Sequence, residues 1–192
     1  MTAQYSDTVV YQGEEFDVGG VNGSGLFEPK DHGVEPASMC TACWRGCVCH
    51  YLVDGQRLTL NRLGLWLAGE QALQADQGVG PKLFGQVPRC TSEQFGTYLY
   101  ADMHGPVAFT GGLLLVRGFI EDLYVHMGFH PAWKFKEVHE LIFRDGLLLS
   151  GKDRSAEMDQ LREGMGSRPV RHDSMTSMAD DIEKAFSLQY RW

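Results

Sequence analysis

CVCHYLVDGQRLTL, residues 47–60, is the stretch of sequence that decides the fold class. Along its first part, Val48, His50 and Leu52 alternate with Cys47, Cys49, Tyr51 and Val53. Every second side chain of a β-strand lies on the same face, so a period of two is typical of a strand. Asp54 and Gly55 follow, and we expect a two-residue type I′ turn there, because Asp tolerates the positive φ angles of this turn and Gly adopts them freely. The stretch predicts an antiparallel hairpin over about residues 44–67.

A second stretch with the same order of features, WKFKEVHELIFRDGLLL, occupies residues 133–149. Each stretch has a tryptophan followed by a basic residue, then an Asp-Gly pair, then a leucine-rich arm. We therefore consider an internal duplication, with pseudo-repeats at residues 40–68 and 130–150. The alternative is that two unrelated amphipathic hairpins share these features, since a single pair is weaker evidence than three or more repeats.

Further strands are expected on either side of these stretches. Residues 8–11 and 14–18 carry β-branched and aromatic side chains around a Gln-Gly turn, so they predict an N-terminal hairpin. The apolar run Leu113–Val116 predicts a strand buried on both faces, near the centre of the sheet. Residues 19–39 are rich in Gly, Pro and Asn, and we expect an ordered loop there.

The C-terminal part of the chain, residues 155–192, is predicted to be helical. Ser155 is expected to cap a first helix and Ser177 a second, with a linker at residues 167–175 between them. In the first helix the apolar side chains share one face, formed by Met158, Leu161 and Met165. Strands followed by helices are the α+β pattern, so we predict a single α+β domain over residues 1–192, built mainly from antiparallel hairpins.

Composition and charge narrow the class of protein. The 192 residues are 43% hydrophobic and 22% charged, a composition that is typical of a folded domain. The net charge of −8 opposes binding to nucleic acid, because the phosphate backbone is also negative. The apolar run 111–116 is far shorter than the roughly 18 residues of a spanning helix, so no membrane segment is expected. Residues 1–7 have no basic and apolar regions of a secretory signal, and an odd count of five cysteines favours reduced thiols, so we expect a cytoplasmic protein.

The cysteine run is the sharpest candidate site. Four thiols and an imidazole within eleven residues could close a tetrahedral zinc site, with candidate ligands Cys40, Cys43, Cys47, Cys49 and His50. The spacing fits zinc only in part, because the first pair alone has the Cys-x-x-Cys form and Cys47 and Cys49 would lie about 7 Å apart along a strand. The alternative is that the thiols are small buried hydrophobic groups.

Histidines form a second candidate group near the second hairpin. Three imidazoles with neighbouring carboxylates suffice for a metal or an acid/base pair, and the members are His126, His130 and His139, with Glu140 and Asp145. Gly128 and Pro131 oppose a continuous helix, so polar residues hydrogen-bonded at strand ends are the favoured alternative. Cys43 or Cys90 could act as a thiol nucleophile, but no local pattern pairs either with a base.

These observations favour a non-catalytic cytoplasmic protein-binding domain, in the manner of an immunity protein that neutralises a basic partner. The acidic surplus would steer such a partner, and exposed aromatic or histidine side chains could anchor it; the candidates are Trp44, Trp133, His126, His130 and His139. Zinc binding is the second hypothesis. A third is a small-molecule binder or hydrolase with its pocket between the two hairpins and the loop at residues 19–39.

Overall fold

The computed structural model describes residues 2–91, 96–165 and 188–190. Within these residues the chain is mostly β-sheet, with one mixed sheet of ten strands and two α-helices, α1 (Gly69–Asp76) and α2 (Ser155–Met165). None of the described helices is long and apolar enough to span a membrane. The strands are β1 (Thr8–Tyr11), β2 (Glu14–Ser24), β3 (Cys47–Asp54), β4 (Arg57–Leu65), β5 (Arg89–Cys90), β6 (Tyr98–Tyr100), β7 (Gly105–Pro106), β8 (Thr110–Phe119), β9 (Phe135–Arg144) and β10 (Leu147–Asp153).

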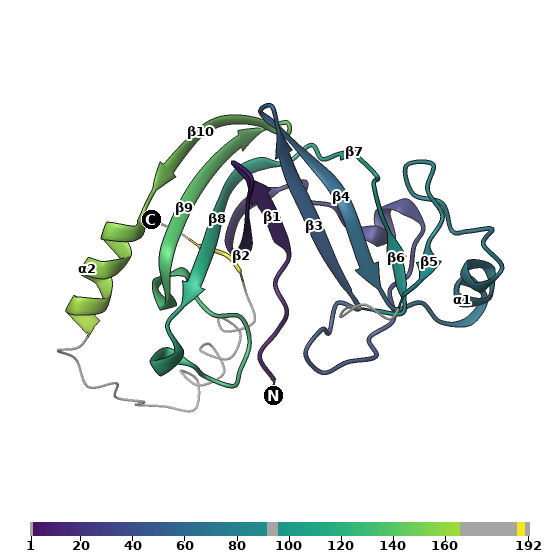
Figure 1. The fold of residues 1–192 in the computed structure, drawn as a ribbon, viewed down its shortest axis with the longest axis horizontal. Coiled ribbons are helices and arrows are strands. Elements are labelled where there is room, and N and C mark those ends of the chain that lie inside the picture. Colours follow the sequence, from purple (N-terminus) through teal and green to yellow (C-terminus); the bar gives the residue numbers. More distant parts are fainter. Residues whose placement is uncertain (1, 92–95, 166–187, 191–192) are drawn as a thin grey trace.

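The sheet bends into an arch (Figure 1). Its strands follow the order β10-β9-β8-β2-β1-β3-β4-β6-β5, and β7 pairs with β4 outside this path. The start of β10 also pairs with the start of β4, at Leu147 and Arg57, so the curved sheet closes on itself at one end. The N-terminal segment and β1 therefore lie between two halves of the molecule, with α2 beside one half and α1 beside the other (Figure 1).

One strand pairing departs from the expectation of antiparallel hairpins. β1 lies parallel to β3, with Thr8 opposite His50 and Val10 opposite Leu52, whereas the other strand pairs of the described residues are antiparallel. This parallel pairing joins the N-terminal pair of strands to β3 and β4, which makes the sheet mixed rather than purely antiparallel.

The three tight turns differ in their agreement with the sequence. Gln12–Gly13 and Asp145–Gly146 have positive φ at both positions, as a type I′ turn requires. The predicted turn at Asp54 and Gly55 is wrong by one residue, because Asp54 pairs with Arg57 and the turn consists of Gly55 and Gln56. The two stretches proposed as pseudo-repeats (40–68 and 130–150) thus differ at their turns, and the duplication stays a hypothesis.

The main core lies against one face of the curved sheet. Its largest fully buried side chains come from several strands and from the segment before β8, and include Tyr51, Tyr100, Phe109 and Phe143. Leu113–Val116 of β8 is buried on both faces, which confirms the prediction. Leu113 and Leu115 face the main core. Leu114 and Val116 face a second cluster, which contains Val138 of β9 and Met158 of α2.

Two segments outside the predicted strands are more regular than expected. The predicted loop at residues 19–39 is wrong in part, because β2 continues to Ser24 and a 3-10 helix occupies Pro29–His32. The short helix α1 is not predicted by the sequence, since Ala75 is its one buried residue and its apolar pattern is weak.

Helix α2 begins where the sequence predicts, but with a different cap. The Asp153 carboxylate accepts the backbone N–H of Ser155, while the Ser155 hydroxyl oxygen accepts the backbone N–H of Val138 on β9. Met158 is buried and Leu161 is exposed, so the predicted apolar face is wrong at Leu161. The predicted second helix at Ser177 and the linker at 167–175 lie outside the described residues.

A buried carboxylate anchors the N-terminal segment to the segment before β3. Asp7 is 4% exposed and accepts two hydrogen bonds from the Arg45 guanidinium, at 2.8 and 3.0 Å. The same carboxylate accepts the backbone N–H of Cys49 at 2.8 Å. Three charge-assisted or backbone donors therefore hold Asp7 next to β3, and they fix the position at which β1 begins.

Candidate functional site

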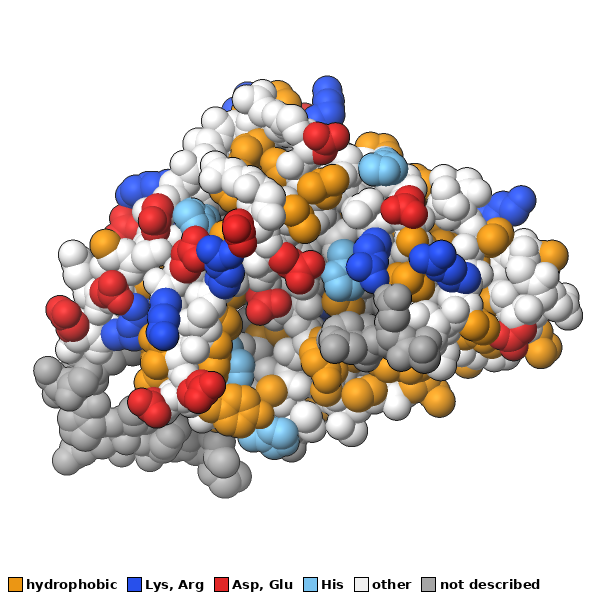
Figure 2. Space-filling view, viewed as in Figure 1, with side chains coloured by type: hydrophobic (Ala, Val, Ile, Leu, Met, Phe, Trp, Pro, Cys, Tyr) orange, Lys and Arg blue, Asp and Glu red, His pale blue; other side chains and the backbone are white. Residues whose placement is uncertain are grey.

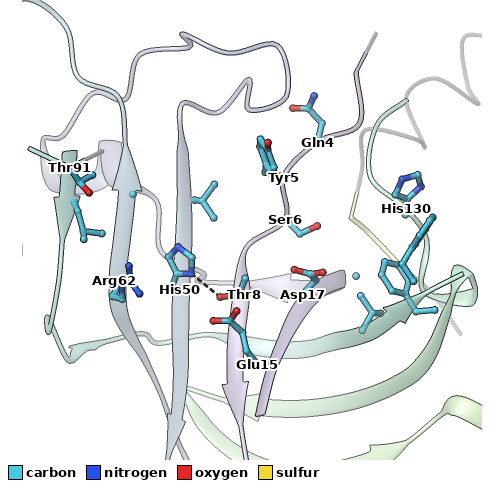
Figure 3. A pocket seen from close by; sticks show the side chains of 17 residues that line it. Gln4, Tyr5, Ser6, Thr8, Glu15, Asp17, His50, Arg62, Thr91 and His130 are labelled. Atoms are coloured by element: carbon cyan, nitrogen blue, oxygen red, sulfur yellow. Dashed lines mark hydrogen bonds between the residues drawn. The ribbon is translucent and has the colours of Figure 1, made fainter. Parts of the chain in front are cut away.

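A cavity of about 660 Å³ lies on the face of the sheet opposite the main core, where the N-terminal segment crosses between the two halves of the arch. Most of its polar side chains come from that segment and from β1 to β4, and they are Gln4, Tyr5, Ser6, Thr8, Glu15, Asp17, His50 and Arg62; Thr91 and His130 line it from other segments. Figure 3 shows these side chains around one space, with His130 at the far side. We call this cavity the sheet pocket.

Strand register places four of these polar residues in one row. Arg62 on β4 is opposite His50 on β3, His50 is opposite Thr8 on β1, and Thr8 is opposite Asp17 on β2. The row continues to Val116 on β8, which also lines the pocket. Because directly opposite residues in neighbouring strands share a face, the row crosses five strands on the pocket side of the sheet.

The alternation along β2 and β3 explains why these side chains face the pocket. Phe16 and Val18 of β2 are buried in the main core, so Glu15 and Asp17 point the other way. On β3 the core takes Cys49 and its neighbours Cys47 and Tyr51, and His50 faces the pocket.

The neighbours of His50 determine the protonation of its ring and the hydrogen bonds that the ring can form. Its Nδ1 lies 2.9 Å from the hydroxyl of Thr8. Burial, followed by the positive charge of Arg62, lowers the pKa of His50, which favours the neutral ring. When the Thr8 hydroxyl donates to Nδ1, the proton of the neutral ring is on Nε2, which leaves one N–H donor for a further partner.

On the acidic side of the pocket, two neighbouring carboxylates, Glu15 and Asp17, repel each other. Burial and then the neighbouring Glu15 raise the pKa of Asp17, although the Asp17 side chain keeps contact with solvent. Two carboxylates at positions i and i+2 of one strand share a face, so the charge of Glu15 disfavours the charge of Asp17. A cation between them would relieve this repulsion.

Replacing Asp17 with asparagine is expected to stabilise the protein at neutral pH but not at pH 3. The raised pKa means that the folded state holds the Asp17 proton more tightly than the unfolded state, whose value is near 3.8. Below 3.8 both states are protonated and the residue contributes no difference; as the pH rises through the raised pKa, ionisation lowers the stability of the wild type. Urea unfolding midpoints of both proteins at pH 3 and pH 7 measure this, and an equal difference at the two pH values would contradict it.

The end of the pocket beyond Asp17, next to β8, is aromatic. The His130 ring lies 4.7 Å from the ring of Phe119 and 5.4 Å from that of Tyr124. Burial and then the charge of Lys134 lower the pKa of His130. Phe119 and Phe135 line the pocket here, so an apolar or aromatic part of a ligand would fit this end.

The predicted histidine group is not brought together. His130 lines the sheet pocket, whereas the exposed His126 contacts the Tyr124 hydroxyl through Nδ1 at 2.8 Å. His139 lies on β9 beside Glu137, with its Nε2 3.0 Å from a carboxylate oxygen. Glu140 accepts hydrogen bonds from Arg154 instead.

The candidate zinc ligands divide between two faces of β3. Cys47 and Cys49 point into the core, whereas His50 lines the pocket. Cys43 is buried with its thiol 3.3 Å from the Cys47 carbonyl oxygen, and Cys40 is half-buried. In the part of the chain that the structure describes, no three His, Cys, Asp or Glu side chains are grouped to hold one metal ion. Zinc binding by these residues stays a prediction.

The other predicted residues lie outside the pocket. Trp44 is exposed beside the N-terminal segment, where its backbone N–H donates to the Gln4 side chain. Trp133 packs beside α2 with the Lys134 ammonium 5.5 Å from its ring centre. The exposed Cys90 has its thiol 3.4 Å from Asp76.

Of the pocket residues, the sequence singled out only His50, as a zinc ligand, and His130, as a metal ligand or an anchor for a partner. The missed polar residues include Thr8, Glu15, Asp17 and Arg62. The alternation of Glu15 and Asp17 with Phe16 and Val18 was a signal for a shared polar face. Comparisons of the chain with protein-family models, curated proteins and solved structures find no match.

Proposed function

We propose that this protein binds a small polar ligand in the sheet pocket. The observation that carries the proposal is the row formed by Arg62, His50, Thr8 and Asp17, which lines a cavity of about 660 Å³. Ligand pockets commonly measure about 300–1,000 Å³ and combine apolar walls with a few convergent polar groups. An ordinary solvent-facing sheet surface would carry polar residues too, but it would not be recessed beneath an N-terminal segment and flanked by aromatic residues.

Filling the pocket tests this function. Ser6 lines the cavity, so Ser6→Trp should place an indole inside it; Ser38→Trp puts the same group on an exposed segment and is the matched control. Ligand-observed NMR with a set of small amines, carboxylates, sugars and zwitterions is expected to find binders of the wild type and of Ser38→Trp. Ser6→Trp should weaken them by at least about tenfold, or about 1.4 kcal/mol.

The folded state of each variant is checked by circular dichroism and its unfolding midpoint. Glu15→Trp fills the same cavity from β2 and replaces Ser6→Trp if that variant does not fold. The proposed function is overturned if no compound loses affinity in a folded, pocket-filled variant.

Binding to a basic protein partner is a second candidate, favoured by exposed apolar side chains beside the pocket. Tyr5, Met39 and Trp44 are 44%, 70% and 51% exposed on two adjoining segments. These segments are joined by a hydrogen bond from the Tyr5 backbone N–H to the Ala42 carbonyl oxygen. The net charge of −8 would steer a basic partner towards the molecule. A partner that binds Ser6→Trp normally but is lost in Trp44→Ala would support this candidate, and cytoplasmic location remains part of the same proposal.

A further inference from the structure

The two ends of the polar row offer opposite chemistry. Arg62 and His50 on β4 and β3 provide hydrogen-bond donors, whereas Asp17 and Glu15 on β2 provide carboxylate oxygens. In Figure 2 a histidine side chain near the middle of the face has acidic side chains to its left and basic side chains to its right, with a further basic side chain among the acidic ones. Thr8 lies between the two ends, opposite both His50 and Asp17.

Among the described residues, no lysine or arginine is paired with the acidic end of the row. Elsewhere on β2, Glu14 pairs with Arg117 at 2.5 Å, and Arg117 also pairs with Glu137. Neither Glu15 nor Asp17 forms such an ion pair with a Lys or Arg of the described residues. Two adjacent carboxylates at the edge of a cavity are suited to an ammonium group, which would relieve their repulsion.

The donor end is suited to an anion. A guanidinium presents planar N–H donors that match a carboxylate, and Arg keeps its charge at all physiological pH values. The Nε2–H of a neutral His50, oriented by its Nδ1 contact with Thr8, would add a donor beside the guanidinium. Both donors come from opposite positions of one antiparallel pair of strands.

The spacing of the row sets the length of the ligand. Neighbouring strands lie about 4.8 Å apart, so the backbones of Arg62 and Asp17, three strand spacings apart, are separated by roughly 14 Å. The long Arg62 side chain shortens the gap between the charged groups. An extended chain of three residues spans about 10 Å. Beyond Asp17 the pocket becomes apolar at Val116, Phe119 and Phe135.

From this geometry we propose that the sheet pocket takes a zwitterionic small molecule of about the length of a tripeptide. Its anionic group binds at Arg62 and His50, its ammonium group binds at Asp17 and Glu15, and an apolar side chain next to the ammonium packs on Phe119 and Phe135. This inference rests on the proposed function, and it names the ligand class for the same pocket.

Three related probes separate the two charges: the tripeptide Phe-Gly-Gly, its C-terminal amide, and its N-acetylated form. Isothermal titration with the full chain is expected to show Phe-Gly-Gly binding at least about tenfold more tightly than either blocked form. Arg62→Gln should weaken Phe-Gly-Gly to the level of the amide and leave the amide unchanged. Asp17→Asn should weaken it to the level of the N-acetylated form and leave that form unchanged.

Matched controls lie outside the pocket. Arg57→Gln is on the same strand as Arg62, and Asp122→Asn is an exposed carboxylate; neither should change the affinity. Equal binding of the three probes, or an equal loss in the control variants, overturns the inference. If pocket-filling by Ser6→Trp still abolishes binding of other compounds, the proposed function stands while the ligand class is wrong; if it abolishes none, both fail.

Discussion

Gly146→Ala is expected to destabilise the fold far more than Gly13→Ala, although both glycines occupy the second position of a type I′ turn. A left-handed conformation costs a non-glycine residue about 1–2 kcal/mol, and both glycines have positive φ, 75° and 84°. A Cβ on Gly146 would also lie 2.1 Å from the carbonyl oxygen of Val107, whereas a Cβ on Gly13 meets nothing within 4 Å. Overpacking of this kind adds about 1–3 kcal/mol.

The difference arises because the β9–β10 turn is docked on the rest of the sheet. The Gly146 N–H donates to the Phe109 carbonyl oxygen at 2.8 Å, and the Gly146 carbonyl oxygen accepts the Leu58 N–H at 2.9 Å. A displaced turn would lose both bonds and loosen the contact between β10 and β4. Urea unfolding of the two variants measures the difference, and similar midpoints would show that the turn can move away from Val107 without cost.

Asp7→Ala is expected to lower the free energy of unfolding by about 3 kcal/mol, because breaking a buried ion pair leaves its remaining partners without compensation. The backbone N–H of Cys49 would lose its acceptor in the core, and Arg45 would lose both hydrogen bonds. The effect lies at the low end of the range for buried pairs, since the Arg45 side chain remains 42% exposed.

The matched control for Asp7 is a carboxylate in an exposed ion pair. Glu14 is 62% exposed and pairs with Arg117, so Glu14→Ala should cost less than about 1 kcal/mol. Chemical unfolding of the two variants in one buffer compares them directly. A cost for Asp7→Ala as small as that for Glu14→Ala would mean that solvent replaces the lost acceptor, and that Asp7 does not anchor the N-terminal segment.

Local patterns in the sequence predicted the strands better than their arrangement. Period-two alternation and turn residues were sufficient for β1, β3 and β9, and the apolar run predicted the buried β8. The parallel pairing of β1 with β3 was beyond this reasoning, because it joins Thr8 to His50 through no turn. The turn after Asp54 shifted by one residue, because Asp54 stays in the strand ladder opposite Arg57.

The candidate site could be predicted only in fragments. Glu15 and Asp17 share a face by alternation alone, but their approach to His50 depends on the register of two strand pairs that meet at β1. The spacing of the cysteine run suggested zinc ligands, but alternation along the same strand directs Cys47 and Cys49 into the core and His50 to the pocket. Alternation along one strand shows which residues share a face, whereas the pocket forms only when separate strands pair with each other.

The way the polar row is assembled has a consequence for folding kinetics. The hairpin β1–β2 holds Thr8 and Asp17, and the hairpin β3–β4 holds His50 and Arg62, so neither hairpin alone has more than half of the four groups. Residues this far apart in the sequence come together slowly, because the entropy cost of closing the chain between them precedes the contacts that offset this cost. A ligand that contacts both ends of the row would bind the native state and not its partly folded precursors. Added ligand should therefore slow unfolding and raise the unfolding temperature with concentration, while the early steps of refolding keep their rates.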